Sequence, residues 1–503
     1  MLYDETLATV TSRARVFGNK VAIICGDTQM SFVELDDKVA RLARDLRVRG
    51  VATKDVISLY GPVGWEWIVA YHAALRVGAV VNPINALLTP DEVNYILSDC
   101  GAKLIFADRG RLDSLAAADA VHSGIETVDF GEIDLLSSTG EGIDPAGVSD
   151  PDALSTICYT SGTTGRPKGA MLSHRNVLMN AALTGLMHGR SAADTTVTAL
   201  PLAHVYGNVV MNGSIIAGAT LVLIPAFAPE AVLEAIELHR ATRFEGVPTM
   251  YYRLLDSPAL PRTNVGTLQY CTVGGQTMPV DKMQAVEARL GCPLLELWGM
   301  SEIGGLGTTF PWTGPRTLGS IGIALPGMEV RTVNAETRLP TASGEAGELQ
   351  IRGATVMIGY LGNPEATRET LDANGWLSTG DVARIDDQGQ VFVIDRMKDV
   401  ILTSGNNVYP AEIERAISSL AGVAMVGVGR DSHPDKGEVP HAFIVCETGA
   451  SLTAEIVVDH CRGLLAPYKI PRSISFVDDL PKTSSGKILR RLLGKAAFDQ
   501  TPV

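Results

Sequence analysis

Short apolar runs rich in β-branched residues alternate with longer helical stretches through the first half of the chain. Between residues 55 and 108 these are, in order, DVISLYG, WEWIVAYHAALRVG, AVVNPIN, DEVNYILSDC and KLIFAD. Strand, helix, strand, helix, strand is the pattern of a doubly wound α/β fold. The pattern resumes with TTVTALP, ATLVLIP, PEAVLEAIELHR and QYCTVGG. We therefore expect doubly wound sheets in a large N-terminal domain.

The pattern changes near residue 320. Short strands such as EVRTV, GELQIRG and QVFVID are separated by Gly and Asp turns, which indicates a distorted β-barrel or a small sheet. Beyond DRMKD, a compact tail combines apolar runs with the helical stretches PAEIERAISSL and AEIVVDHCRGLL. Because 503 residues exceed what one core usually supports, we expect two domains, residues 1–396 and a small α+β domain of residues 397–503.

Charge and cysteine usage exclude several classes of function. The net charge of −14 argues against a nucleic-acid partner, since binding to a phosphate backbone needs clustered cations. The seven cysteines are scattered and form no C-x-x-C pair, and the histidines do not cluster with them. This usage indicates a reducing compartment and no structural zinc site.

One uncharged stretch, residues 205–229, is long enough to suggest a membrane span. Gly, Asn and Pro residues interrupt it, and TLVLIP within it has the character of a buried strand. The N-terminus has two early acids and lacks the basic segment and apolar run of a secretory signal. We expect a soluble, cytoplasmic protein with no integral membrane segment, and the sequence leaves its oligomeric state open, with a homodimer as one option.

The stretch YTSGTTGRPKG at residues 159–169 has the chemistry of a phosphate-binding loop. Its glycines let backbone N–H groups converge on an anion, its hydroxyls add donors, and its lysine adds a positive charge. The spacing is not that of a Walker loop, and a flexible surface loop is the plain alternative. So many donors beside a lysine, at an expected strand-to-helix junction, favour phosphate. The residues concerned are Thr160, Ser161, Gly162, Thr163, Thr164, Gly165 and Lys168.

This loop closely resembles the signature of the AMP-forming acyl-CoA synthetases, which are relatives of luciferases and peptide-synthetase adenylation domains. Seven further motifs of the family follow in order, so the resemblance covers almost the whole chain. They are LPLAHVYG at 200–207, GGQTMP at 274–279, ELWGMSE at 296–302, GELQIRG at 347–353, GWLSTGD at 375–381, DRMKDVILTSGNNVYPAEIE at 395–414 and PKTSSGKILRR at 481–491.

The resemblance implies a reaction in two steps. A carboxylate first attacks the α-phosphate of ATP, with Mg²⁺ bound, and releases pyrophosphate to leave an acyl-adenylate. The thiol of coenzyme A then displaces AMP. In the family a small C-terminal domain rotates between the two steps, so the resemblance also implies that the domain of residues 397–503 is mobile.

Three residues are expected to be catalytic by this resemblance. Glu302 would bind Mg²⁺, although alone it would pass for an acid at a helix start. Lys487 would reach the carboxylate and the α-phosphate during the first step, whereas alone it would pass for a solvated lysine. His204 would lie beside the nucleotide and the acyl carboxylate, although a lone histidine is more often simply packed.

The resemblance also assigns a nucleotide site. Asp381 would accept hydrogen bonds from both ribose hydroxyls, with Arg396 beside it. The plain alternatives are an aspartate in a turn and an ion pair on the surface. Trp298 replaces the commoner tyrosine beside adenine, and Ser301 replaces the commoner threonine. The remaining positions expected to contact ATP or AMP are Gly275, Gln276, Gly299 and Met300.

Coenzyme A and the domain motion are assigned to the last hundred residues. By resemblance, Ser404, Gly405 and Asn406 would line the tunnel for pantetheine, and Lys398 would be the hinge. Ser404 and Asn406 depart from the commonest family pattern, in which a second glycine and a glutamate stand there.

Gln276 is the most serious departure, because many relatives have a small residue beside the acyl group and adenine. Its amide can narrow the pocket, bind a polar acid, or displace the acyl group. The small and apolar stretches VYGNVVMNGS and GGLGTTF favour a hydrophobic acid, whether fatty, aromatic or polycyclic, over a short dicarboxylate. The absence of an aspartate near residue 203 disfavours amino acids.

An acid:CoA ligase is the function that the sequence favours. One alternative is an enzyme that mainly converts a supplied acyl-adenylate to a thioester, because Gln276 has impaired the first step. Others are a stand-alone adenylating enzyme that loads a carrier protein or oxidises its adenylate, and a non-catalytic nucleotide-binding relative. Lys168, Glu302 and Lys487 together argue against the last.

Overall fold

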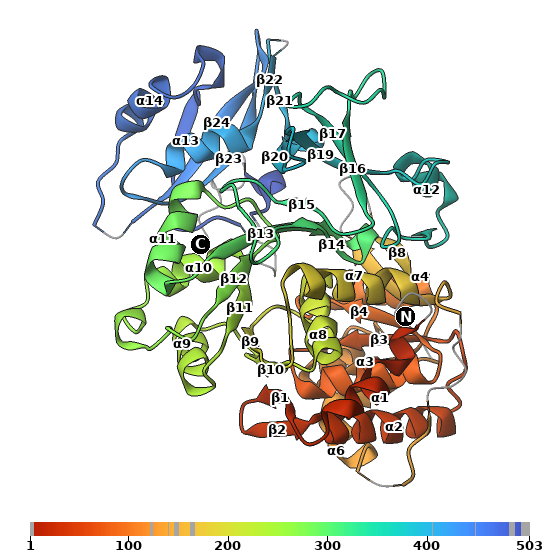
Figure 1. The fold of residues 1–503 in the computed structure, drawn as a ribbon. Coiled ribbons are helices and arrows are strands. Elements are labelled where there is room, and N and C mark those ends of the chain that lie inside the picture. The colour runs from red at the N-terminus through yellow and green to blue at the C-terminus, as the bar shows by residue number, and fades with distance from the viewer. Residues whose placement is uncertain are drawn as a thin grey trace.

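Four β-sheets and the helices around them make up the computed structural model of the protein (Figure 1). The structure describes residues 5–120, 124–138, 140–144, 150–160, 166–404, 406–447, 449–481 and 488–493. Two large sheets form the N-terminal part, a four-stranded sheet follows, and a five-stranded sheet belongs to the C-terminal end of the chain. This arrangement is the α/β fold class that the sequence predicts.

The first large sheet has seven strands, and its centre is parallel. Strands β3, β4, β5, β6 and β7 pair in parallel, whereas β7 pairs antiparallel with β8, and β8 with β18. In sheet order the strands are β18 (Gly359–Tyr360), β8 (Lys168–Ser173), β7 (Leu154–Thr160), β4 (Val80–Ile84), β3 (Val56–Tyr60), β5 (Ala102–Ala107) and β6 (Glu126–Asp129).

The second large sheet has nine strands and again a parallel centre. Antiparallel strands close it at both ends, β2 beside β1 and β14 and β15 beside β13. In sheet order the strands are β15 (Ile323–Ala324), β14 (Gly305–Thr309), β13 (Leu294–Met300), β12 (Tyr270–Val273), β11 (Arg243–Gly246), β9 (Thr195–Thr198), β10 (Thr220–Leu223), β1 (Val21–Cys25) and β2 (Thr28–Ser31).

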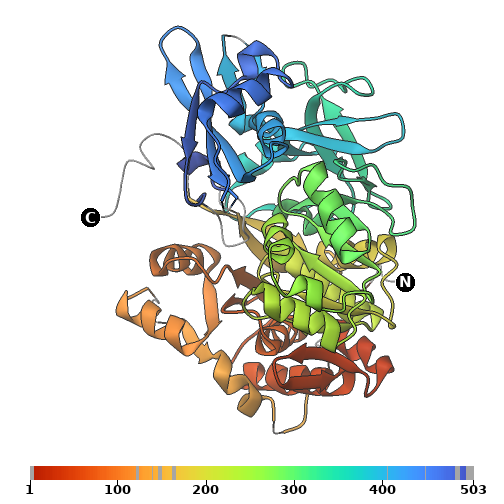
Figure 2. The same cartoon turned by 90° about the vertical axis from the view of Figure 1, so that its left-hand side faces the viewer.

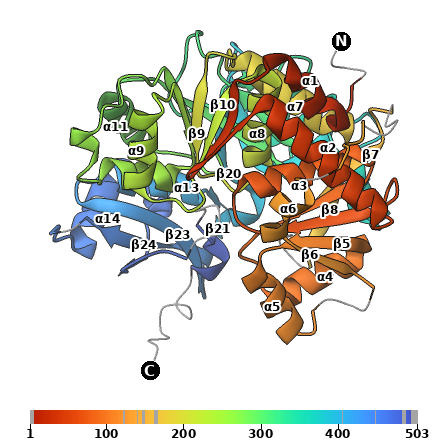
Figure 3. The same ribbon diagram turned by 90° about the horizontal axis from the view of Figure 1, so that it is seen from below.

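Helices fill the space between the two sheets (Figure 3). Helix α3 (Trp65–Arg76) contacts both β3 and β1, and α7 (His174–Met187) contacts both β8 and β14. Their buried side chains join one continuous hydrophobic core, as expected for helices covered on both sides. The other helices of this part are α1 (Val10–Ala14), α2 (Phe32–Val48), α4 (Pro90–Cys100), α5 (Arg109–Ala117), α6 (Ile133–Leu136), α8 (Val205–Ala217), α9 (Pro229–Leu238), α10 (Pro248–Leu255) and α11 (Val280–Leu290).

Local sequence explains where these helices start and stop. Helix α4, for example, follows Thr89, whose hydroxyl accepts from the backbone of Glu92 while the Glu92 carboxylate accepts from the backbone of Thr89. Pro90 occupies its first turn, where a missing N–H costs no hydrogen bond, and Gly101 ends it in the left-handed conformation. The same reciprocal cap begins α2 and α7.

The third sheet is antiparallel. Its order is β16 (Glu329–Val333), β17 (Gly347–Arg352), β19 (Leu377–Ile385) and β20 (Val391–Arg396), with α12 (Pro364–Thr370) in the connection from β17 to β19. Of the two alternatives that the sequence left open here, a barrel or a small sheet, this strand order matches the small sheet. The pairing of β19 with β20 sets Asp381 opposite Arg396.

The chain leaves the third sheet at Arg396 and enters the fourth at Ile401, after the short helix η7 (Met397–Asp399). We call the part beyond Arg396 the C-terminal domain; Figure 2 shows it in blue at one end of the molecule. Helices α13 (Pro410–Ser418) and α14 (Ala454–Arg462) accompany its sheet. The strands are β22 (Asn406–Val408), β21 (Ile401–Thr403), β24 (Gly437–Cys446), β23 (Val423–His433) and β25 (Ser473–Phe476), the last parallel to β24.

The uncharged stretch 205–229 forms helix α8 and, within TLVLIP, the buried strand β10 that the sequence predicts. Within the described part of the chain, no helix combines the length and the apolar composition needed to cross a bilayer. All seven cysteines are free thiols, five of them buried and Cys25 and Cys446 partly buried.

Candidate functional site

The predicted site residues gather at the carboxyl ends of parallel strands in both large sheets. In the seven-stranded sheet, β7 ends at Thr160, where the glycine-rich loop begins. In the nine-stranded sheet, β12 runs into Gly275 and Gln276, and β13 ends at Met300 just before Glu302. Ligands of open α/β sheets bind at this edge, because the loops after the strands converge there.

The glycine-rich loop connects two antiparallel strands, so the predicted strand-to-helix junction is wrong. Thr160 of β7 and Lys168 of β8 are paired in register and form the base of the loop. The run KGAMLS continues as a strand because it pairs with β7, and α7 begins only at His174, capped by Ser173. Ser161, Gly162, Thr163, Thr164 and Gly165 lie outside the described residues.

Tyr360 connects Glu302 to Lys168. The Tyr360 hydroxyl donates to Glu302 Oε1 at 2.9 Å, and Lys168 Nζ lies 5.3 Å from the centre of the Tyr360 ring. Strand β18 makes this possible, because it pairs Tyr360 with Ala170, two residues beyond Lys168. Sequence reasoning missed Tyr360, since a two-residue strand carries no periodicity.

Glu302 is nearly inaccessible, with 8% of its surface exposed, in the short helix η6 (Ser301–Ile303). Burial raises the pKa of this carboxyl, while the hydrogen bond from Tyr360 and the charge of Arg396 oppose the rise. A carboxylate whose hydrogen-bond partner Tyr360 also contacts Lys168 is suited to a metal ion that also binds phosphate oxygens. In proteins, Mg²⁺ is usually held by one or two carboxylates together with phosphates of the substrate. A single Glu therefore fits that ion.

Asp381 is the centre of a second cluster. It is 3% exposed; Arg396 Nε lies 2.6 Å from its Oδ1, and Trp298 Nε1 donates to its Oδ2 at 2.7 Å. The surface alternatives for Asp381 are therefore wrong, because this carboxylate is buried among donors. Each carboxylate oxygen keeps a further lone pair with which it can accept a hydrogen bond from a hydroxyl group.

Gly299 must be glycine for this cluster to form. A β-carbon there would lie 1.9 Å from the carbonyl oxygen of Gly305, on the neighbouring strand β14. The pairing of β13 with β14 shifts register between Trp298 and Gly299. The irregularity lies directly beside Trp298.

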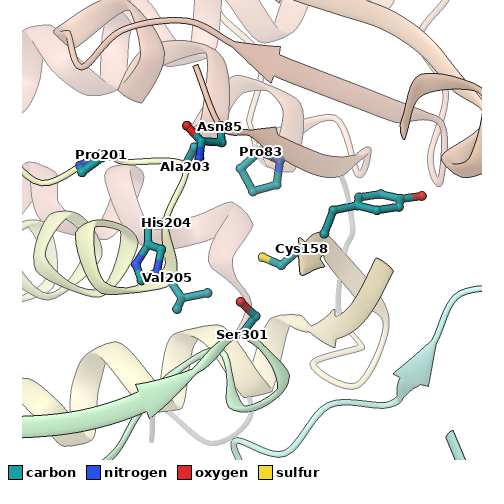
Figure 4. Close-up of a pocket in the computed structure, with 9 residues that line it drawn as sticks. Pro83, Asn85, Cys158, Pro201, Ala203, His204, Val205 and Ser301 are labelled. Carbon is teal, nitrogen blue, oxygen red and sulfur yellow. The ribbon is translucent and has the colours of Figure 1, made fainter. Parts of the chain in front are cut away.

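His204 lies on an open cleft with Ser301 (Figure 4). Its Nδ1 accepts from the backbone N–H of Tyr206 at 3.2 Å and caps α8, so in the neutral ring Nε2 carries the proton. About 520 Å³ of the cleft is free of protein atoms, part of it open to solvent. The cleft is lined by Pro83, Asn85, Cys158, Tyr159, Pro201, Ala203, His204, Val205 and Ser301.

The structure gives local features for several of the remaining predicted residues. Gly275 adopts a φ of +88°, a left-handed conformation that favours glycine, and Gln276 beside it is partly buried. Lys398 lies in η7, where the chain passes into the C-terminal domain. Asn406 Nδ2 donates to the carbonyls of Thr403 and Ser404. Gly405 and Lys487 lie outside the described residues.

Comparison with known proteins assigns the family. The profile of the AMP-binding enzyme family matches residues 10–361, and that of the AMP-binding enzyme C-terminal domain matches residues 412–487. The chain belongs to the AMP-binding enzyme family. It is 34% identical to a feruloyl-CoA synthase from an Amycolatopsis species over 95% of this chain and 96% of that protein. It is 31% identical to a long-chain-fatty-acid–CoA ligase from Bacillus subtilis, over 98% and 94% of the two chains.

Solved structures of AMP-binding enzymes have the same architecture. The anthranilate CoA ligase AuaEII in complex with anthranoyl-AMP gives a TM-score of 0.92 at 26% identity, covering 98% of both chains. ATP-bound MatB from Rhodopseudomonas palustris gives 0.90 at 32% identity, over 97% of this chain and 99% of that one. The apo form of the same protein gives 0.80, over 97% and 98% of the two chains. The whole-chain arrangement is thus closer to the ATP-bound form than to the apo form.

Proposed function

We propose that this AMP-binding enzyme is an ATP-dependent acid:CoA ligase. The observation that carries the proposal is the joining of Glu302 and Lys168 through Tyr360, close to Ser301 and the cleft. In this proposal Glu302 would bind the metal ion and Lys168 a phosphate, while Ser301, the residue before Glu302, lines the cleft that would admit the acid. The relatives described above carry the names of CoA ligases and synthases, which supports the same reaction.

The first step joins the acid to AMP. A carboxylate oxygen of the acid attacks the α-phosphorus of ATP, the bond to the bridging oxygen breaks, and pyrophosphate leaves. Lys168 and Lys487 would stabilise the charge on the phosphate oxygens, and Asp381 would hold the ribose. Mg²⁺, held by Glu302, would neutralise charge that develops on the leaving pyrophosphate.

The second step forms the thioester. The sulfur of coenzyme A, after losing its proton, attacks the carbonyl carbon of the acyl-adenylate, and AMP leaves. We assign Ser404, Gly405 and Asn406 to the path of pantetheine and Lys398 to a hinge about which the C-terminal domain turns between the steps. The location of Lys398 between two sheets supports that assignment.

We propose a hydrophobic substrate, either an aromatic or a fatty acid. Pro83, Cys158, Ala203 and Val205 give the cleft apolar walls, and two relatives act, by their names, on a ferulic and on a long-chain fatty acid. His204, with its Nε2 proton, can donate to the acid's carboxylate. We also place the enzyme in the cytoplasm, in keeping with seven free thiols.

Acid-dependent release of pyrophosphate from MgATP tests the proposal. The panel should contain ferulate, indoleacetate, 2-succinylbenzoate and palmitate, with succinate and malonate as short dicarboxylates. We expect release with an aromatic or fatty acid, and thioester only when coenzyme A is added. Turnover of succinate or malonate alone would overturn the substrate class. Thioester formed only from a synthetic acyl-adenylate would mean that the first step is impaired, as a disruptive Gln276 would predict.

A further inference from the structure

Arg490 forms a partly buried ionic junction beside the hinge. Its guanidinium binds Glu414 with two bonds, Nε to Oε1 at 3.1 Å and Nη2 to Oε2 at 2.6 Å. Its Nη1 lies 2.8 Å from Asp395 Oδ1 and 3.2 Å from Asp399 Oδ2. The Asp395 side chain is 1% exposed, so this part of the junction is shielded from solvent. The neighbouring carboxylates raise the pKa of Arg490 although burial alone would lower it, and the guanidinium stays charged.

The partners of Arg490 lie on both sides of the hinge. Asp395 belongs to β20, before Lys398, whereas Glu414 belongs to α13 in the C-terminal domain. Asp395 also accepts from the backbone N–H of Ala411 at 2.7 Å, at the start of α13. Two contacts of one buried carboxylate therefore join the large part of the chain to the C-terminal domain in this arrangement.

The segment that carries Arg490 is itself fixed in place. Leu489 N donates to the carbonyl of Pro481 at 2.8 Å, which joins the two ends of the stretch that contains Lys487 in sequence. Leu493 packs against β23 at Gly427 and Gly429, where a β-carbon on Gly429 would lie 2.4 Å from the carbonyl oxygen of Leu493. The absence of side chains at these two glycines lets the segment approach the strand.

Asp395 is also the neighbour of a nucleotide-site residue. Its Oδ1 accepts from the backbone N–H of Arg396 at 2.8 Å, and the Arg396 side chain pairs with Asp381. The junction therefore lies one peptide unit away from the group that we assign to the ribose.

We propose that Arg490 is a positioning residue for the first half-reaction, acting through its contact with Asp395 across the hinge. The proposal rests on the proposed ligase function and its two domain arrangements. The Arg490–Asp395 pair belongs to the arrangement seen here, which is closer to an ATP-bound than to an apo relative. A rotation about Lys398 would separate the two side chains, so the second half-reaction does not need them paired.

Two half-reactions measured separately test this. Adenylation is followed by exchange of labelled pyrophosphate into ATP with whichever panel acid the wild type adenylates. Thioester formation is followed with that acid's synthetic adenylate and coenzyme A. We expect Arg490→Gln to slow adenylation by about 10- to 100-fold and to leave thioester formation within about threefold. Arg490→Lys should recover part of the loss, since it keeps the charge without the two-pronged geometry.

Asp395→Asn tests the partner across the hinge and does not depend on the folding of the Arg490 variants. It should show the same selective loss, and combining it with Arg490→Gln should add little to that loss, because both variants remove the Arg490–Asp395 ion pair. Arg462→Gln is the matched control, since Arg462 forms an exposed pair with Asp459 on α14 of the same domain. It should change neither half-reaction.

Equal loss in both half-reactions, or no loss, in folded Asp395→Asn would overturn the positioning role while leaving the ligase intact. A wild-type protein inactive in both half-reactions across the panel would instead overturn the proposed function itself. The two failures are therefore distinguishable by the wild-type measurement alone.

Discussion

Trp298 donates a hydrogen bond from its indole nitrogen to Asp381 Oδ2, across 83 positions of sequence. Both side chains are buried, and Arg396 occupies the other carboxylate oxygen. The tryptophan thus orients a carboxylate through a polar edge, in addition to offering an aromatic face. A tyrosine at this position would lack the indole N–H.

Trp298→Phe should weaken ATP binding. The variant keeps an aromatic ring but removes one hydrogen-bond donor to Asp381. Because a hydrogen bond to a charged acceptor contributes more free energy than a neutral one, we expect its loss to raise KM for ATP about tenfold. The measurement is KM for ATP in acid-dependent pyrophosphate release. Trp312→Phe, at a partly exposed tryptophan outside the site, is the control. An unchanged KM for ATP in Trp298→Phe would show that Asp381 needs no such donor.

Tyr360→Phe should impair the use of Mg²⁺. The variant removes the hydrogen bond to Glu302, so the carboxylate is less well fixed, and we expect the half-saturating Mg²⁺ concentration to rise about tenfold. Tyr468→Phe, at an exposed tyrosine, is the control. Equal Mg²⁺ dependence in Tyr360→Phe and the wild type would contradict the role given to this hydroxyl.

The same variant should change the pH profile in a defined direction. Burial raises the pKa of Glu302 and the Tyr360 hydrogen bond opposes that rise, so losing the hydroxyl raises the pKa further. In the proposed mechanism activity needs the ionised Glu302 carboxylate, so it should be lost as the pH falls through this pKa. The acid limb of the adenylation rate should therefore move to higher pH in Tyr360→Phe. A shift to lower pH would contradict the assignment of that limb to Glu302.

His204 allows the capping and chemical roles of one side chain to be separated. Asn is a good N-cap, so His204→Asn should preserve the start of α8 while removing the ring N–H, whereas His204→Ala removes both. We expect both variants to lose about tenfold or more in adenylation rate, and only His204→Ala to unfold at a lower temperature. Full activity in His204→Asn would show that His204 only caps α8 and takes no part in adenylation.

Glu296 makes the stability of the fold depend on pH. Burial raises the pKa of this carboxyl to about 8, against the one hydrogen bond that it accepts from Gly319 N. In the unfolded chain the group ionises near pH 4, so the unfolded state loses its proton first and stability falls as the pH rises from about 4 to about 8. Glu296→Gln should therefore unfold at a higher temperature than the wild type at pH 8.5, with a smaller difference at pH 5.5.

Thermal unfolding at the two pH values measures this effect. Glu336→Gln, at an exposed carboxylate, is the control and should change neither value. A stabilisation by Glu296→Gln that is equal at both pH values would show that lost charge is not its cause.

Patterns along the chain predicted much of the fold because its central strands are short, apolar and separated by helices. The run DVISLYG forms β3 and WEWIVAYHAALR forms α3; both are buried almost throughout, so the length of the run separates the strand from the helix. Motif resemblance placed Glu302, Asp381 and Arg396 in one family site, and the structure brings Asp381 and Arg396 into contact.

Residues that act through tertiary contacts could not be found this way. Tyr360 reaches Glu302 because the two-residue strand β18 pairs with β8. A strand of two residues has no hydrophobic periodicity from which this pairing could be predicted. Arg490 meets Asp395 from 95 positions away, and its charge alone would fit an exposed tail. The sequence predicts a strand-to-helix junction at the glycine-rich loop, whereas the pairing of KGAMLS with β7 makes that run a strand.

The proposed function requires this enzyme to form an acyl-adenylate and to pass the acyl group to coenzyme A. The most direct test is to quantify AMP, ADP, pyrophosphate, phosphate and thioester in one reaction containing MgATP, coenzyme A and the best acid of the panel. We predict equal amounts of AMP, pyrophosphate and thioester, with acyl-adenylate accumulating on the enzyme when coenzyme A is withheld. Thioester accompanied by ADP and phosphate would contradict the account, because no adenylate would then lie on the path.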